Sequence, residues 1–166
     1  MHNNFEKPCN GGEIQELDLY RSSRLGGVYT VLMDDQFTLI YGNDLYFQLH
    51  EFDPEELLGK SCTIFIHPQD LDHVRDVLNR TRELGLKNAE WEMRIITGKK
   101  NVKYTLVSGS FNMRDGQEVF DGYITDISKQ KHMEQQIRDL TENEAELQKQ
   151  IELYRMTDLG GVFSVA

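Results

Sequence analysis

Residues 88–127, NAEWEMRIITGKKNVKYTLVSGSFNMRDGQEVFDGYITDI, decide the fold because they hold three long β-rich runs joined by two tight turns. The runs cover 88–97, 102–113 and 117–127. Polar turn residues separate them, and the Asp115-Gly116 pair suits a type I′ turn. Strands joined by hairpins pair antiparallel, so this stretch predicts the larger part of an antiparallel sheet.

The residues before this stretch supply two more strands and the helices between them. Short β-rich runs flank the polar turn 34–36, which predicts a hairpin. Helical patterns follow, and two have clear starts: Asp53-Pro54 begins one and His67-Pro68 the other. The two strands cover 28–33 and 37–41, and the helices cover 43–50, 53–58 and 67–84. This order predicts an α+β fold, a five-stranded antiparallel sheet with helices on one face.

After the sheet, a heptad pattern of apolar residues runs through 128–158. The spacing alternates between four and three residues, and β-branched residues at a with Leu at d favour a parallel two-stranded coiled coil. The a positions hold Gln130, Ile137, Glu144 and Ile151, and the d positions hold Met133, Leu140, Leu147 and Tyr154. Glu144 would bring two carboxylates together in a dimer, so we expect a marginal coiled coil that can switch between two arrangements.

The end of this helix repeats a segment from the start of the chain. Residues 17–32 and 151–166 share eight of sixteen residues, where average composition would give about one. We therefore expect an N-terminal helix over 13–24 that is a version of the coiled-coil helix, and the start of a second repeat over 159–166. Residues 1–12 are polar, so we expect a disordered tail there. The homodimer is expected to form through both helices.

Composition narrows the class of function. The 166 residues are 39% hydrophobic, which supports one domain with a core, and the net charge is −10. Such acidity argues against nucleic acid and against direct contact with an anionic membrane. No apolar run approaches the roughly 18 residues of a membrane span. Two cysteines, Cys9 and Cys62, offer neither a disulfide framework nor metal spacing and suit a reducing cytoplasm.

Four motifs, in order and spacing, resemble those of a PAS domain with a trailing PAC segment. They are FTLIYGN at 37–43, DPEELLGK at 53–60, HPQD at 67–70 and GYITDISK at 122–129. The resemblance implies a PAS domain over 25–127 that encloses a small cavity able to hold a ligand. It also implies a bacterial tandem-PAS signalling protein, with a cyclic-di-nucleotide synthesis or hydrolysis domain or a histidine kinase as the downstream effector.

The resemblance assigns signal transfer to the junction between sheet and helix. Ser128 would cap the output helix two residues after Asp126, since a serine oxygen accepts from free amides of a first helical turn. Lys131 replaces the Glu of a full capping box, so we expect a soft junction. The signal would then pass along Met133, Ile137, Leu140, Glu144, Leu147 and Ile151.

Polar side chains on the long strand are the candidate ligand contacts. By period-two alternation, Ser108, Ser110 and Asn112 share a face with Tyr104, and this face either lines the cavity or looks outward. Asn43 is a further candidate, although a helix N-cap explains it equally well. Trp91 either lines a pocket or packs on the outer face of the sheet, and we favour the packing role.

The sequence argues against a cofactor. Cys62 aligns with the cysteine of flavin-binding light-oxygen-voltage PAS domains, but Ser61 and Thr63 replace the Asn and Arg that hold flavin there. His73 lies where some PAS proteins bind haem, yet it sits at the edge of the apolar helix face. We expect a structural Cys62, a solvated His132 rather than a phosphate acceptor, no metal site and no catalytic residue.

These features give one leading function and two alternatives. The leading function is a cytoplasmic sensory module in which an unidentified small molecule enters the cavity, shifts the sheet and changes the dimeric helix. The second is a ligand-free module for dimerisation and relay, with a core filled by side chains. The third is a flavin or haem sensor of light or redox state. In each case we expect this chain not to be an enzyme.

Overall fold

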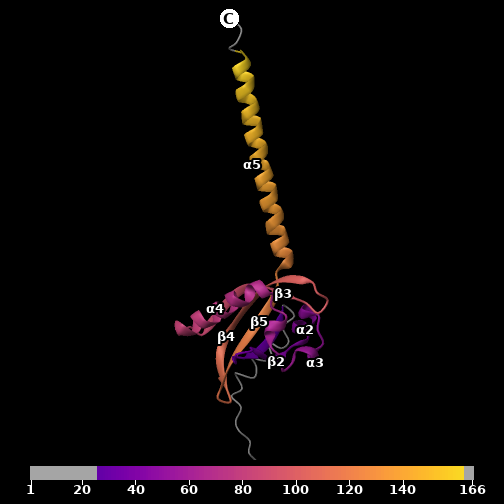
Figure 1. The fold of residues 1–166 in the computed structure, drawn as a ribbon, viewed down its shortest axis with the longest axis vertical. Coiled ribbons are helices and arrows are strands. Elements are labelled where there is room, and N and C mark those ends of the chain that lie inside the picture. The colour runs from indigo at the N-terminus through magenta and orange to yellow at the C-terminus, as the bar shows by residue number, and fades with distance from the viewer. Residues whose placement is uncertain (1–25, 163–166) are drawn as a thin grey trace, which may run out of the picture. The chain divides into compact units, whose positions relative to one another are not determined.

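The computed structural model describes residues 26–162 and separates two units, Met1–Ile127 and Ser128–Ala166. The first unit contains the sheet and its helices, and the second contains one long helix (Figure 1). The predicted tail at 1–12, the predicted N-terminal helix at 13–24 and the last four residues of the predicted second repeat lie outside the described residues.

A five-stranded antiparallel sheet forms the first unit, with the strand order β2-β1-β5-β4-β3. The strands are β1 (Gly27–Leu32), β2 (Thr38–Gly42), β3 (Asn88–Ile96), β4 (Val102–Arg114) and β5 (Gln117–Asp126). Asp115 and Gly116 have φ of 49° and 77°, the positive values that a type I′ turn requires. The predicted α+β fold, with helices over one face of the sheet, is confirmed.

Short helices between β2 and β3 cover the sheet. They are α2 (Asp44–His50), α3 (Pro54–Leu57), the 3₁₀ turns η1 (Cys62–Ile64) and η2 (Pro68–Asp70), and α4 (Leu71–Glu83). The predicted start of α3 is confirmed, because Asp53 and Glu56 form a capping box around Pro54. The Asp53 backbone N–H donates to Glu56 Oε2 at 2.9 Å. The local sequence therefore sets where this helix begins.

Asp70, in the HPQD motif, fastens the start of α4 to β3. Its Oδ2 accepts from the Arg94 backbone N–H at 2.7 Å and from Arg94 Nε at 3.0 Å, and its Oδ1 accepts from Arg94 Nη2 at 2.5 Å. The His67 backbone N–H donates to the Arg94 carbonyl at 2.9 Å. Hydrogen bonds from Arg94 hold the pKa of Asp70 below its ordinary value. The motif thus joins a helix start to a strand far away in sequence.

Asp70→Asn is expected to destabilise the domain by about 2 kcal/mol, because it removes a charge-assisted, partly buried pair while keeping the side chain's shape. Urea unfolding followed by Trp91 fluorescence measures this. The folded pKa of Asp70 is lowered, so its contribution is present at neutral pH and disappears as the pH falls below its ordinary range. Wild type and Asp70→Asn should therefore converge in stability in acid; a constant gap down to pH 2 would contradict this reading.

The second unit is α5 (Ser128–Val162), a helix of 35 residues. It starts where the sequence predicted and runs four residues past the predicted end at Asp158. By the shift between the repeats, 161 and 162 correspond to Gly27 and Val28, which pair with β5 in the first unit. Among the described residues no strand pairs with 161–162, and both lie in α5. The second repeat stays a prediction.

Candidate functional site

The four candidate residues on β4 share one face, as predicted, but that face looks outward. Tyr104 is 44% exposed, whereas its neighbour Thr105 is fully buried and pairs with Met93. Asn112 Nδ2 donates to Asp121 Oδ2 at 2.7 Å, within a polar network on this outer face. Ser108 and Ser110 alternate in the same register as Tyr104 and Asn112. Alternation defines two faces of a strand, and the covering helices decide which one is inside.

Asn43 is the N-cap of α2. Its Oδ1 accepts from the backbone N–H groups of Tyr46 and Val28, both at 3.0 Å, and its own N–H donates to the Val28 carbonyl at 3.0 Å. The side chain therefore fixes α2 against β1. The five candidate ligand contacts are absent from the described cavity lining.

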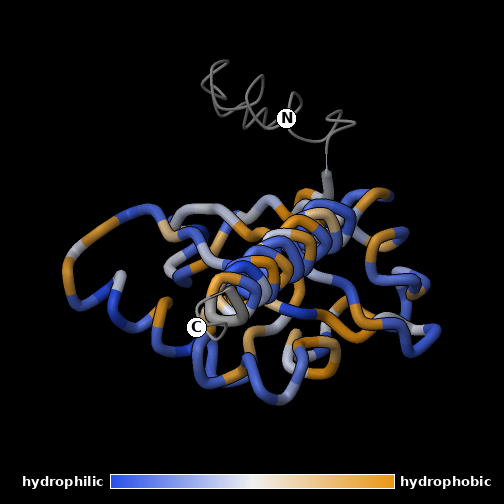
Figure 2. The backbone as a smooth tube through the Cα atoms, turned by 90° about the horizontal axis from the view of Figure 1, so that it is seen from above, coloured by the Kyte–Doolittle hydropathy of each residue, from blue (hydrophilic) through white to orange (hydrophobic). Residues whose placement is uncertain are grey.

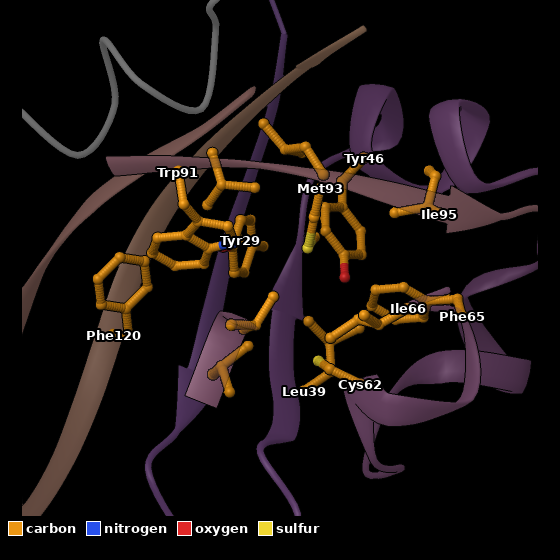
Figure 3. Close-up of a cluster of buried hydrophobic side chains, with 14 of the residues drawn as sticks. Tyr29, Leu39, Tyr46, Cys62, Phe65, Ile66, Trp91, Met93, Ile95 and Phe120 are labelled. Atoms are coloured by element: carbon orange, nitrogen blue, oxygen red, sulfur yellow. The ribbon is translucent and has the colours of Figure 1, made fainter. Parts of the chain in front are cut away.

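An apolar cavity lies between the inner face of the sheet and the covering helices. The volume that water-sized molecules can occupy in this cavity is about 40 Å³, which is room for roughly two or three water molecules. Figure 3 shows part of the lining, with Trp91 and Tyr29 on one side and Phe65 and Ile66 on the other. The lining comprises Tyr29, Val31, Met33, Phe37, Tyr46, His50, Cys62, Phe65, Ile66, Val74, Leu78, Trp91, Met93, Phe120 and Ile124.

Trp91 lines this cavity from the inner face of β3. It is 7% exposed, its ring centroid lies 5.5 Å from that of Phe120, and it pairs with Val107, which is fully buried. The favoured position on the outer sheet face was therefore wrong. Glu90 and Glu92, its neighbours on β3, occupy the outer face instead.

His50 is the residue of the cavity that the sequence analysis missed. It is fully buried, its ring centroid lies 4.2 Å from that of Tyr46 and 4.4 Å from that of Phe65, and its Nδ1 lies 2.7 Å from the Tyr46 carbonyl oxygen. Burial lowers the pKa of His50 to about 4, so the ring is neutral at pH 7. Because a carbonyl only accepts, Nδ1 carries the proton and Nε2 presents a lone pair.

Cys62 is buried in the same lining and is not poised for chemistry. Burial raises the pKa of its thiol to about 12, so the thiol stays protonated and is a poor nucleophile. The Tyr46 hydroxyl, which points toward Cys62 in Figure 3, offsets only part of this rise in pKa. A structural role for Cys62 agrees with this position.

The cavity in this conformation does not fit a flavin or a haem, both of which are far larger than the open space. Ser61 and Thr63 do not line it; their hydroxyl oxygens lie 2.7 Å apart, and Ser61 Oγ donates to the Gln36 carbonyl. His73 lies exposed on α4, and His132 lies exposed on α5. Within 26–162, no group of three potential metal ligands comes together, and no helix is long and apolar enough to span a membrane.

The signal-transfer candidates lie at the end of β5 and along α5. Asp126 is the last residue of β5 and Ser128 the first of α5. Along α5 the apolar heptad residues are exposed, including Ile137 at 63% and Leu140 at 69%. Figure 2 shows apolar segments recurring between hydrophilic ones along this helix. The same holds for Met133, Leu147, Ile151 and Tyr154, and Glu144 is exposed at its a position.

An antiparallel five-stranded sheet with helices closing a small core cavity is the PAS fold. A family model described as PAS domain matches residues 27–129, more than half of the chain, and the chain therefore belongs to the PAS domain family. PAS domains are sensory modules of signal transduction and are not catalytic by themselves, so this chain is a non-enzymatic sensory domain.

Solved structures with this fold come from several kinds of signalling protein. A PAS domain of a two-component sensor histidine kinase is 13% identical (TM-score 0.56), over 71% of this chain and 99% of that one. A sensory box histidine kinase/response regulator from Burkholderia thailandensis is 18% identical (TM-score 0.62), over 79% and 98%. An RNA-binding light-oxygen-voltage receptor is 14% identical (TM-score 0.62), over 85% and 42%. A search of curated proteins found no match.

Proposed function

We propose that this chain is a sensory relay: a small molecule in the core cavity changes the sheet, and α5 passes the change to a downstream effector as a dimeric coiled coil. The exposed heptad residues of α5 carry the proposal. Apolar side chains at regular a and d spacing on a solvated helix lower their free energy by packing against a second copy. A 35-residue helix directly after β5 connects the sheet to that packing.

The effector proposed is a cyclic-di-nucleotide synthesis or hydrolysis domain or a histidine kinase, and the proposed location is the cytoplasm. Two of the similar structures come from proteins that their names describe as histidine kinases, which supports the latter effector. The acidic composition, with a net charge of −10, supports the absence of nucleic acid and anionic membrane from the proposed partners.

A second repeat starting at 159 gains support from the packing of its counterparts Gly26 and Gly27. A Cβ on Gly27 would lie 2.7 Å from Tyr46 Cα, and one on Gly26 would lie 2.6 Å from the Tyr123 ring. The close packing around Gly26 and Gly27 thus requires both glycines. The same pair at 160–161 is consistent with the start of a second unit.

The small cavity favours one alternative, a relay that binds no ligand. Both the ligand-binding relay and the ligand-free relay require that the core is coupled to α5, and spin labels can test this coupling.

A label on Gln135→Cys, in a Cys9→Ser background, reports the distance between the two helices of a dimer. Filling the cavity with Cys62→Met is expected to change the distance distribution, while Ser108→Ala on the outer face should leave it unchanged. Identical distributions in all three proteins would refute coupling.

A further inference from the structure

Two buried polar atoms of the cavity lining have no hydrogen-bond partner within the described part of the chain. They are His50 Nε2 and Trp91 Nε1, on residues that are 0% and 7% exposed. An unpaired buried polar group loses its hydration without compensation, so such groups in folded proteins ordinarily meet water or a ligand. Both atoms belong to side chains that line the same cavity.

The two atoms have complementary hydrogen-bonding roles. The Tyr46 carbonyl fixes the proton of His50 on Nδ1, which leaves Nε2 as an acceptor. The indole nitrogen of Trp91 can only donate. A group that meets His50 Nε2 must therefore donate a hydrogen bond, and a group that meets Trp91 Nε1 must accept one.

Aromatic rings connect the two ends of the site. Ring centroids lie 5.5 Å apart for Trp91 and Phe120, 6.5 Å for Phe120 and Tyr29, 5.1 Å for Tyr29 and Tyr46, and 4.2 Å for Tyr46 and His50. The lining contains no described Asp, Glu, Lys or Arg. An apolar wall without a counter-ion strongly disfavours a charged ligand.

We infer that the cavity binds small uncharged molecules that carry both a hydrogen-bond donor and an acceptor, such as a short amide or alcohol, and that His50 Nε2 and Trp91 Nε1 hydrogen-bond to the ligand or to a water beside it. The open space of about 40 Å³ limits the ligand to a few non-hydrogen atoms. This inference rests on the sensory role proposed above and names the ligand class. For so few atoms, the dissociation constant is on the order of a millimolar or weaker.

Formamide is a suitable probe, and xenon is its apolar counterpart. Trp91 is the only tryptophan of the 166-residue chain, so its indole N–H gives one unambiguous NMR signal. Formamide is expected to move this signal along a saturating curve, whereas xenon should leave it in place. A shift that stays linear in formamide would mean water only in the cavity, and saturation by xenon alone would mean a dry apolar void. Either result overturns the inference.

Substitutions identify the binding atoms. His50→Phe and Trp91→Phe are each expected to weaken formamide binding at least about fivefold, and His73→Phe, on the exposed face of α4, is the matched control. Because Trp91→Phe has no indole, the NMR signal of the Met93 methyl group is used to follow formamide binding in that variant. Should His50→Phe fail to fold, Trp91→Phe decides: binding at wild-type affinity refutes the site. These experiments test ligand binding in the cavity only. They can refute the ligand class without refuting the α5 relay, and the experiments on α5 can refute the relay without refuting the ligand class.

Discussion

Glu144→Ile is expected to tighten self-association of the full chain by about 100-fold or more. In a parallel dimer, the a position of one helix faces the a position of the other, so two Glu144 carboxylates would share a desolvated site. Isoleucine removes that repulsion and buries an apolar side chain in each helix, a gain of about 1.5–3 kcal/mol per copy. Sedimentation equilibrium gives the dissociation constant, and circular dichroism gives the melting temperature of α5, which should rise.

Glu142→Ile is the matched control for this substitution. Residue 142 lies two positions before Glu144, at the f position, which points away from the seam. The two variants change composition and charge identically, so nonspecific hydrophobic association would increase in both. If Glu144→Ile leaves the association unchanged, or if Glu142→Ile has the same effect, then Glu144 does not face a partner.

His50 is expected to make the domain lose stability between about pH 6.5 and pH 4. Its pKa is about 4 in the folded chain and 6.5 as the ordinary value. The unfolded chain therefore takes up a proton first as the pH falls, and the unfolded state gains free energy of binding relative to the folded one. Over the whole interval the loss is about 3 kcal/mol. Below pH 4 both states carry the proton, so His50 adds no further loss.

The measurement is urea unfolding followed by Trp91 fluorescence at pH 7, 6, 5 and 4.5. His50→Phe should flatten this pH dependence, while His73→Phe should keep it. Lys103, whose Nζ donates to the Leu49 carbonyl at 2.9 Å, also lowers the pKa of His50. Carboxylates with lowered pKa, such as Asp34 and Asp70, act at lower pH. A wild type with constant stability from pH 7 to 4.5 would contradict a neutral, buried His50.

Local signals in the sequence were enough to predict the elements of the fold. The Asp115-Gly116 turn, the Asp53 capping box and the Asn43 cap all depend on residues within three or four positions of each other. The backbone conformations that these residues favour do not need distant contacts. The order of the strands and helices then followed from the positions of these signals.

The inner face of the sheet could not be predicted in the same way, because it depends on which helices cover it. On β4, Thr105 and Gly109 are on the inner face, whereas Tyr104 and Leu106 are on the outer one. Gly109 is needed inside because a Cβ there would lie 2.6 Å from the Phe120 ring. Apolar residues occur on both faces of β4, so the polarity of the strand left open which face lines the cavity.

His50 was missed for a related reason. The apolar residues of α2 in the sequence are Leu45, Phe47 and Leu49. In the structure, Tyr46 and His50, four residues apart, lie on the buried side of α2 together with Phe47. The contact that completes the burial of His50 comes from Phe65, which is distant in sequence. A helical period applied to 46 and 50 could have found the residue, although its unpaired Nε2 could not have been predicted.

Disulfide formation between Leu140→Cys residues tests the central claim most directly. In a parallel, in-register coiled coil, the d positions of the two helices face each other closely enough for a disulfide. In a Cys9→Ser background, the full chain carrying Leu140→Cys is expected to form a covalent dimer rapidly under mild oxidation, and Glu142→Cys should form it at least about tenfold more slowly. Equal rates for the two variants, or no dimer from Leu140→Cys, would contradict a relay built on a parallel dimer of α5.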